Sequence, residues 1–490
     1  MFANLSKLMG FSRSRGSFPQ LEQGGVHRVS LLILVIVGLL GYQGASYVGF
    51  LILVMLGVTV YEFVKRIDQG LPLMQVAALL SVLQWTAGPW LTYNIDLSYS
   101  TYGMRVASDT YFMYAIPGTA AFVVGLLAVG VSPRQRGLLR KVDRANFVQV
   151  GMILAMLGFA GGLGAKLLSG GSLAFVCYLI SQLRYVAALY FIFSRHPLRW
   201  LFAGLSVLPL LTGTAETGMF HDLLLWVGIL MCYVYALKPR KIWVTLLVVM
   251  GGLVMVFTVQ GIKRSYRDKV WNNEKGSLVD EVKGFWEDPR ALYGEETLAN
   301  AIIRINQGWI IASIMGNVPS SEPYAMGDTV GDAVTAALVP RMIAEDKVTA
   351  GGQVNFRRFT GLPIADTTSM GLSLLGESYA NVGPETGVFL MLLFGALMSL
   401  SCGFCLLWSV KHPTFYFWIP VIFCQTIKAE TDLVTVLNHI TKGSIVVFGM
   451  YWLICIKLLP AARARKVARR RPVDSPESRL GKQRLAKESR

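Results

Sequence analysis

The chain has 490 residues, of which 53% are hydrophobic and 15% charged, and its mean hydropathy is +0.50. Soluble domains carry about 25% charged residues, so these figures exclude an ordinary soluble protein. The formal net charge of +17 would suit a nucleic-acid-binding protein, but the positions of the basic residues decide whether that interpretation holds.

Apolar runs bounded by charged or turn residues recur along the sequence, and a membrane-spanning helix needs about 20 mostly apolar residues. The first, seventh and eleventh runs are short and would be tilted or re-entrant. The first run has no cleavage site with small residues and a second run follows at once, so we interpret it as a retained span. The twelve predicted spans are 29–43, 46–64, 71–91, 111–131, 145–163, 171–193, 200–211, 220–237, 242–259, 388–410, 414–427 and 444–459.

The distribution of Lys and Arg predicts the orientation of the spans. With the N-terminus inside, 28 of the 46 basic residues lie on inner segments and four on short outer loops. Short cytoplasmic loops are enriched in Lys and Arg, whereas long loops cross the membrane regardless of charge. We therefore expect both termini in the cytoplasm and no nucleic-acid partner. The basic tail either anchors this topology or binds anionic lipid headgroups.

The predicted organisation is an all-α polytopic membrane protein with one large periplasmic loop. The cytoplasmic segments contain no P-loop, no dinucleotide-binding glycine motif and no H-E-x-x-H motif, so ATP-driven transport and the use of cytosolic nucleotide sugars are disfavoured, and any chemistry faces outward. We expect no cofactor and no metal. The predicted parts are a cytoplasmic N-terminal segment (1–28), a first transmembrane bundle (29–259), the large loop (260–387), the final transmembrane helices (388–459) and a basic cytoplasmic tail (460–490).

The large loop holds 12 basic and 16 acidic residues and has helical patterns of its own. Apolar positions at i, i+3 and i+4 spacing predict a helix over 295–315. A second helix is predicted over 329–338 with Asp328 as its N-cap, and a third over 370–381, stopped by Gly383 and Pro384. Long ordered loops are usually functional.

Two groups of cations are candidates for binding phosphate at the outer membrane boundary. Arginine presents a planar fork that engages phosphate oxygens in pairs. For the first group the alternative is an interfacial position with the charge in the headgroups, and for Arg341 it is an ion pair with Glu345 or Asp346. The two groups are Lys263, Arg264 and Arg267, where the ninth span emerges, and Arg341, Arg357 and Arg358, within the loop.

Arg184 lies midway through the sixth predicted span, where a charge costs about 2.5–3.5 kcal/mol on insertion scales. Such a residue faces a cavity or a partner. Its two open roles are an ion pair with Glu216 or Asp222 and the binding of a ligand.

The segment 376–387 brings polar residues to the entrance of the tenth span. Glu377 and Asn381 share one helix face, with Tyr379 between them. A carboxylate here would act as general base towards a sugar hydroxyl, and the alternative is ordinary hydrogen bonding at a helix end. His439 near the last outer connection either orients a substrate or has a structural role, and the pair Glu430 and Asp432 resembles a metal-binding pair only superficially.

A late outer loop flanked by Arg clusters and closed by the segment 376–387 resembles the Wzy-type polymerases of O-antigen and oligosaccharide repeat units. Relatives carry an Arg in a turn between two middle spans, where this chain has Thr212-Gly-Thr-Ala215-Glu216. Arg184 or Arg267 would have to supply that cation.

The resemblance implies a GT-C-like helical glycosyltransferase of the bacterial inner membrane. It would polymerise polyprenyl-pyrophosphate-linked repeat units into O-antigen, capsule or exopolysaccharide chains at the periplasmic face. Its partners would be the lipid-linked glycans, membrane lipid, and chain-length regulator and flippase proteins. The alternatives are a lipid-linked oligosaccharide flippase or transporter, another lipid-dependent glycosyltransferase, and an O-antigen ligase. The implied roles are catalysis for Glu377 and Arg341, and substrate binding for Arg184, Lys263, Arg264, Arg267, Arg357, Arg358, Tyr379, Asn381 and His439.

Overall fold

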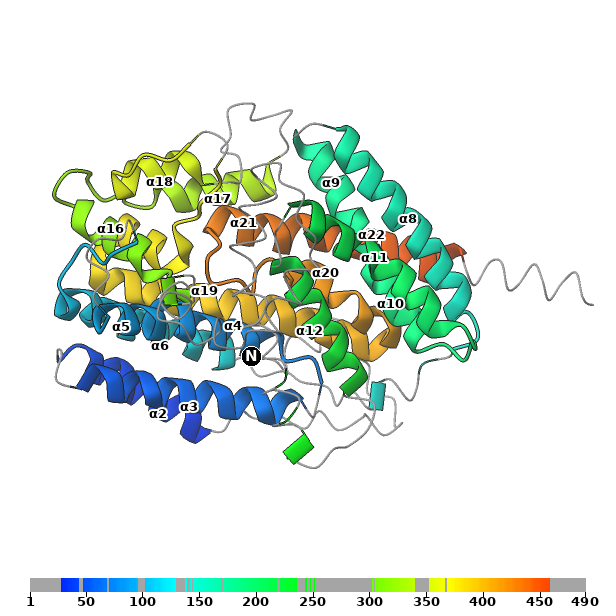
Figure 1. Ribbon diagram of the computed structural model, residues 1–490, viewed down its shortest axis with the longest axis horizontal. Helices are drawn as coiled ribbons and strands as arrows, with labels where there is room; N and C mark the ends of the chain where they lie inside the picture. Colours follow the sequence, from blue (N-terminus) through cyan, green and yellow to red (C-terminus); the bar gives the residue numbers. More distant parts are fainter. Residues whose placement is uncertain are drawn as a thin grey trace, which may run out of the picture. The chain divides into compact units, whose positions relative to one another are not determined.

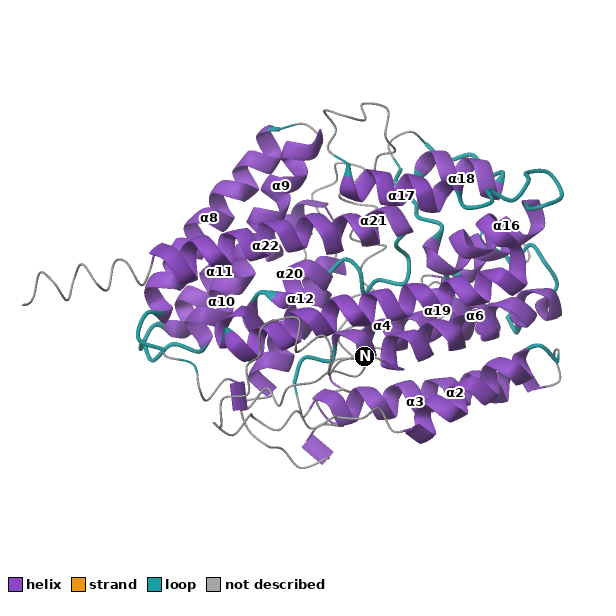
Figure 2. Ribbon diagram, turned by 180° about the vertical axis from the view of Figure 1, so that it is seen from behind, coloured by secondary structure: helices purple, strands orange, loops and turns teal. Residues whose placement is uncertain are grey.

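A computed structural model of the chain is helical over the part that it describes, where there is no strand (Figures 1 and 2). The all-α prediction is therefore confirmed for that part. The chain divides into two units, Met1–Gly443 and Ser444–Arg490. The described residues are 28–43, 47–67, 70–95, 102–128, 137–138, 142, 144–168, 171–217, 221–235, 243–244, 247, 251, 302–303, 305–339, 352–365 and 368–458.

Six helices within the described ranges are long and apolar enough to cross a membrane, so the chain is a helical membrane protein. They are Val48–Ile67, Ser108–Ala128, Phe147–Leu167, Leu173–Ile192, Ser373–Lys411 and Leu433–Leu458. Shorter apolar helices occupy Arg28–Gly41, Asp222–Tyr235 and Pro413–Phe423. The total of twelve spans stays a prediction, and the ninth span, 242–259, lies almost wholly outside the described residues.

The first group of helices packs around α6 (Ser108–Ala128) and α19 (Ser373–Lys411), which lie side by side. Two glycines permit this close approach: a Cβ on Gly125 would lie 2.4 Å from the Leu392 carbonyl oxygen, and one on Gly395 would lie 2.3 Å from that of Phe122. Small residues that let backbones meet are typical of membrane helix interfaces. The other members are α2 (Arg28–Gly41), α3 (Val48–Ile67), α4 (Leu73–Val82), η2 (Leu83–Ala87) and α5 (Gly88–Tyr93).

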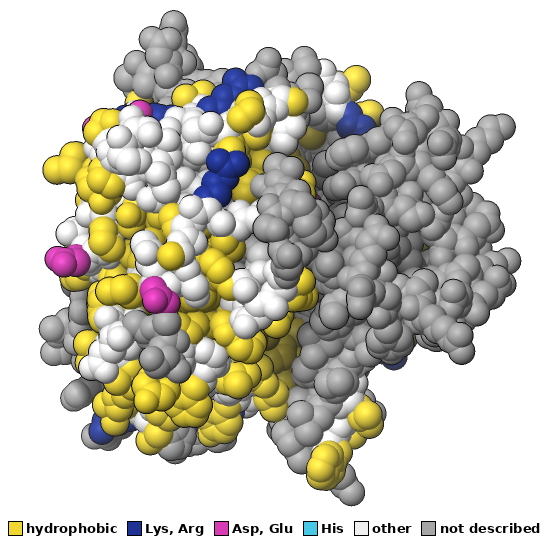
Figure 3. Space-filling model, turned by 60° about the vertical axis from the view of Figure 1, so that its left-hand side comes forward, with side chains coloured by type: hydrophobic (Ala, Val, Ile, Leu, Met, Phe, Trp, Pro, Cys, Tyr) yellow, Lys and Arg dark blue, Asp and Glu magenta, His cyan; other side chains and the backbone are white. Residues whose placement is uncertain are grey.

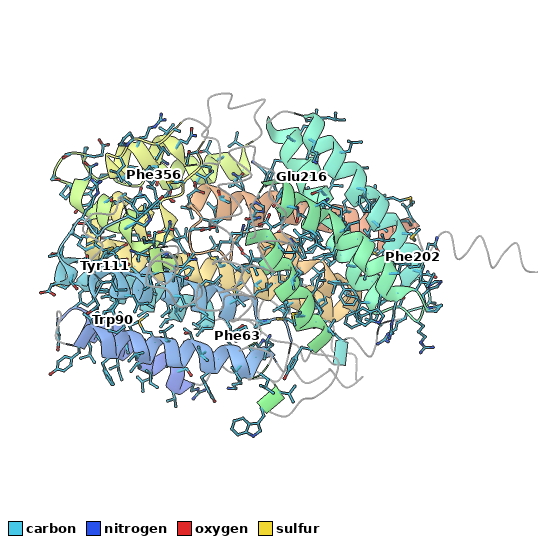
Figure 4. All side chains as sticks on the ribbon, viewed as in Figure 1. Phe63, Trp90, Tyr111, Phe202, Glu216 and Phe356 are labelled. Carbon is cyan, nitrogen blue, oxygen red and sulfur yellow. The ribbon has the colours of Figure 1, made fainter. Side chains whose placement is uncertain are left out.

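Helix α3 lies against the third predicted span, which is formed by α4, η2 and α5. Trp90 of α5, labelled in Figure 4, makes this contact, because a Cβ on Gly49 of α3 would lie 2.9 Å from its ring. The third span is thus a continuous helical run with a π-helical turn in its middle, at η2.

The second group contains five helices that correspond to the fifth to eighth predicted spans. Helix α8 packs on α9 and α10, and α10 also packs on α11. Gly158 and Gly161 of α8 lie against the chain at Arg184 and Ser181, where a Cβ would approach backbone atoms to 2.6 and 2.8 Å. The five helices are α8 (Phe147–Leu167), α9 (Gly171–Ser181), α10 (Leu183–Ile192), α11 (Arg199–Thr217) and α12 (His221–Tyr235).

The large loop contributes three described helices. α16 (Gly308–Asn317) matches the second half of the helix predicted over 295–315. α17 (Asp328–Leu338) matches the predicted second helix, but its N-cap is Gly327, which has φ of 100°, so the prediction of Asp328 as N-cap was wrong by one residue. α18 (Gln353–Thr360) lies between Gly352 and Gly361, whose positive φ values end the helix on both sides.

The helix that leads into the tenth span begins at Ser373 and bends at Gly383, where φ is 74° and ψ is −171°. The predicted break at Gly383 and Pro384 is therefore present, but the chain resumes a helix directly and α19 runs on to Lys411. Four short helices complete the first unit: η4 (Pro413–Phe417), α20 (Ile419–Phe423), α21 (Leu433–Asn438) and η5 (His439–Gly443). The second unit begins with α22 (Ser444–Tyr451) and η6 (Trp452–Leu458).

Several contacts join the ends of different helices. Lys166 pairs with Glu216, and Lys428 pairs with Asp222. Tyr416 accepts a hydrogen bond from the Leu71 N–H, and Tyr233 donates to the Tyr416 carbonyl. The side of the membrane that each of these ends faces stays a prediction.

Candidate functional site

Glu377 joins three elements of the first unit through its carboxylate. The Thr329 hydroxyl of α17 donates to its Oε1 at 2.9 Å, and the Leu433 N–H of α21 donates to its Oε2 at 2.8 Å. Only 1% of Glu377 is exposed. A buried carboxylate is destabilised unless donors replace water, and these two donors do so.

Asn381 lies one helical turn further along α19 and completes this group. Its Nδ2 donates to the Thr329 Oγ1 and to the Glu377 carbonyl oxygen, both at 2.7 Å. The Thr329 hydroxyl is therefore held between an amide that donates a hydrogen bond to it and a carboxylate that accepts its hydrogen bond. The Asn381 Oδ1 is buried without a partner in the described part of the chain. Figure 1 shows α17 beside α21, as their packing requires.

The sequence prediction of Glu377 and Asn381 on one helix face is confirmed by these contacts. Tyr379 lies on another side, where its ring meets Tyr114 at 5.1 Å and Tyr324 at 6.2 Å between centroids. Thr329 was missed because a threonine in a short amphipathic helix carries no chemical signal of its own. Only the tertiary contact between α17 and α19 reveals it.

The two loop arginines on α18 are already engaged. Arg358 donates to Glu322 at 2.5 Å and lies over the Phe359 ring, 4.8 Å from its centroid. The Arg357 guanidinium donates to the Ile364 carbonyl. Both are exposed, so they can exchange these contacts for a ligand at little cost, since exposed ion pairs contribute only about 0–1 kcal/mol.

Arg184 contacts a phenol where the sequence suggested an acid. It donates to the Tyr185 hydroxyl at 3.0 Å and stacks on that ring, 5.0 Å from the centroid. Its Nε is buried and has no hydrogen bond to any described residue. Glu216 pairs with Lys166 and Asp222 with Lys428, so the expected ion pair of Arg184 with either acid is replaced by these two.

His439 belongs to a second polar group, which we call the His439 cluster: Tyr178, Asp222, Gln425, Lys428 and His439. Lys428 donates to Asp222 at 2.9 Å, and Gln425 donates to the Tyr178 hydroxyl at 2.9 Å and to Asp222 at 3.4 Å. The His439 ring meets Tyr178 edge-on at 6.3 Å, and both Lys428 and Asp222 are near enough to act on it electrostatically.

The sequence pointed to His439 but missed the other members of this cluster as site residues. They come from α9, α12 and the connection after α20, which are far apart in sequence. Asp222 had entered only as a partner for Arg184, and Gln425 and Tyr178 resemble ordinary polar residues near span ends. Ionisable side chains among apolar helices are a useful signal, and here that signal was present in Asp222 and Lys428.

The connection from Cys424 to Leu433 runs between the two groups and is held along its length. Lys428 is bound by Asp222, and Trp85 donates to the Ala429 carbonyl at 3.1 Å. Asp432 caps α21 by accepting the Thr435 N–H at 2.9 Å, which gives this acid a structural role. The Leu433 N–H then meets Glu377.

Four predicted site residues, Lys263, Arg264, Arg267 and Arg341, lie outside the described residues. Figure 3 shows one face of the molecule. Hydrophobic side chains cover much of the described surface in this view, and charged side chains lie at isolated points.

Comparison of the chain with protein-family models, with curated proteins and with solved structures gives no match.

Proposed function

We propose that this chain is a glycosyltransferase of the Wzy type, which joins polyprenyl-pyrophosphate-linked oligosaccharide units at the outer face of the bacterial inner membrane. The observation that carries the proposal is the Thr329 hydroxyl, bound between the Glu377 carboxylate and the Asn381 amide. An acceptor sugar hydroxyl needs the same surroundings, because a base must take its proton while a second group fixes its oxygen.

In the proposed reaction the acceptor hydroxyl takes the place of the Thr329 hydroxyl. Its O–H bond breaks and the proton passes to Glu377, while its oxygen forms a bond to the anomeric carbon of the growing chain. The bond from that carbon to the lipid pyrophosphate breaks, and the pyrophosphate leaves with the electron pair. No cytosolic energy source is needed, because the donor is already activated.

Cations would stabilise the negative charge that develops on the leaving pyrophosphate. Arg357 and Arg358 support this role because they are exposed and hold exchangeable partners. We assign the same role to Arg341, Lys263, Arg264 and Arg267. Tyr379 and Arg184 are assigned to substrate binding.

The test is deletion of the gene followed by gel analysis of the surface glycan. Loss of the long-chain ladder with single units retained is expected, and the wild-type chain should restore the ladder. Glu377→Gln should abolish it, because an amide cannot accept the proton. Glu385→Gln is the matched control, since Glu385 is an exposed acid on the same helix, and it should restore the ladder fully.

Thr329→Val separates the catalytic role of Glu377 from a purely structural one. The acceptor displaces the Thr329 hydroxyl, so the hydroxyl is not needed for the reaction. When the variant and the wild type are compared at the same amount of protein in the membrane, the variant should therefore keep the ladder. Equal loss of ladder and of membrane protein in Glu377→Gln and Thr329→Val would refute the catalytic role. A full ladder in the deletion strain would refute the proposed function.

A flippase or transporter is the second candidate, and one observation favours it. Asp222, at the start of α12, pairs with Lys428, whose side chain is only 10% exposed. Ionisable residues enclosed by membrane helices are typical of substrate or ion pathways in transporters. If single units also disappear from the surface of the deletion strain, this candidate replaces the polymerase.

A further inference from the structure

Within the part of the chain that the structure describes, Tyr178, Gln425, Lys428 and His439 keep hydrogen-bond donors or acceptors that are not engaged. Tyr178 accepts from Gln425 and keeps its own O–H, and the Gln425 amide uses its Nε2 and keeps its oxygen. Lys428 uses one of its three donors on Asp222. His439, which is 5% exposed, has its Nδ1 buried without a partner among the described residues. A buried polar atom left unpaired costs about 1–3 kcal/mol, so a ligand that satisfies it is favoured.

The charge of the cluster favours a neutral ligand. Lys428 and Asp222 neutralise each other at 2.9 Å. Lys442, which lies 5.8 Å from the centroid of the Phe175 ring, donates to the Ala336 carbonyl and to Asn438. A phosphate would place a negative group beside the Asp222 carboxylate and would be repelled by it. A sugar ring presents hydroxyls that both donate and accept hydrogen bonds, which matches the donors and acceptors of the cluster.

Aromatic rings line the same place. Phe175 and Tyr178 are nearly parallel, with an interplanar angle of 27° and centroids 6.3 Å apart, and the His439 ring meets both edge-on. Phe175 and Tyr178 are both partly exposed. The apolar C–H face of a sugar can pack on such rings, while its hydroxyls reach the polar groups, as is usual where a few polar groups orient a ligand on an aromatic lining.

The exposure of the ion pair indicates where a ligand enters. The Asp222 side chain is 43% exposed, whereas that of Lys428 is 10% exposed. The cluster is therefore open beside Asp222 and closed beside Lys428 and His439.

The cluster also lies within reach of Glu377. Lys428 and Leu433 are five residues apart, so their Cα atoms are at most about 18 Å apart, and Leu433 donates to Glu377. A short oligosaccharide can span that distance.

We infer that the His439 cluster is a subsite for one neutral sugar ring of the lipid-linked unit. The inference rests on the proposed function for the identity of the ligand. Tyr178, Gln425 and His439 bind the hydroxyls, and the Asp222–Lys428 pair holds the connection that carries Gln425. Each direct hydrogen bond lost should weaken binding by about tenfold.

The binding test uses the full chain in lipid nanodiscs and saturation-transfer NMR. The probes are p-nitrophenyl glycosides of glucose, galactose, mannose, rhamnose and N-acetylglucosamine, with inorganic pyrophosphate as the anionic probe. Tyr178→Phe removes a single oxygen and Gln425→Leu removes one amide. Each substitution should weaken the affinity for the glycoside by about tenfold. Glu216→Gln, in the exposed pair with Lys166, is the control and should bind as the wild type does.

The subsite is supported if at least one glycoside binds the wild type, and if its affinity is lower in Tyr178→Phe and Gln425→Leu but unchanged in the control. Binding of no glycoside, equal binding by all variants, or displacement of the glycoside by pyrophosphate overturns it. The cell assay separates this failure from failure of the proposed function. A ladder that needs the chain but is restored fully by Tyr178→Phe and Gln425→Leu refutes the subsite alone, whereas a ladder that persists in the deletion strain refutes the function.

Discussion

Replacing Glu377 by alanine removes the acceptor of two buried donors. Thr329 and Leu433 are each 1% exposed, so water cannot replace the lost carboxylate oxygens. Each donor left unpaired costs about 1–3 kcal/mol, so Glu377→Ala should lower the free energy of unfolding by about 2–6 kcal/mol. Glu377→Gln keeps one acceptor oxygen and should lose about half as much.

The assay is titration of the detergent-solubilised protein with SDS, which gives the free energy of unfolding of each variant. Glu385→Ala is the control on the same helix, and because Glu385 is exposed, its effect should stay within about 0.5 kcal/mol. If Glu377→Ala is as stable as Glu385→Ala, then Thr329 and Leu433 find other partners and the carboxylate does not hold the three elements together.

Three further substitutions test the fold by the same titration. Gly383→Ala should lower the free energy of unfolding by about 1–3 kcal/mol, because φ of 74° with ψ of −171° is a conformation that only glycine adopts readily. The Tyr324 ring would also lie 3.1 Å from the new Cβ. An unchanged free energy of unfolding would refute the bend. Gly125→Ala should lower stability by about 1–3 kcal/mol because its Cβ would meet backbone atoms of α19, whereas Gly57→Ala, with open space around it, should be neutral or slightly stabilising. Asp432→Ala should cost about 1 kcal/mol through loss of the cap of α21, and an unchanged value would show that this cap is dispensable.

The helices could be predicted where the signal is local. Apolar runs indicated α3, α6 and α8 closely, since each is long and uniformly apolar. Gly383 marked a break in the helix, because a positive φ is a property of single residues. Gly352 and Gly361, which bound α18, have positive φ for the same reason. The error at Asp328 arose because the preceding Gly327 takes the left-handed conformation and begins the helix one residue earlier.

The candidate site was less predictable because its contacts join distant segments. Spacing placed Glu377 and Asn381 on one face, but nothing local indicated that Thr329 would lie between them. One of the two open roles of Arg184 was an ion pair with Glu216 or Asp222, yet these acids pair with Lys166 and Lys428. Pairing of charges within a bundle depends on which helix ends meet, and a single sequence does not contain that information.

The connection from Cys424 to Leu433 also has a consequence for biogenesis. Its contacts reach back 344 residues to Trp85, 206 residues to Asp222 and 56 residues to Glu377. At about 5–20 residues per second, the ribosome needs about 10–40 s to pass from Asp222 to Lys428. During that interval the earlier helices are in the membrane without these partners. The final assembly of the bundle therefore waits for nearly the whole chain to be synthesised, and a product that stops before residue 424 lacks the segment that joins its two polar groups.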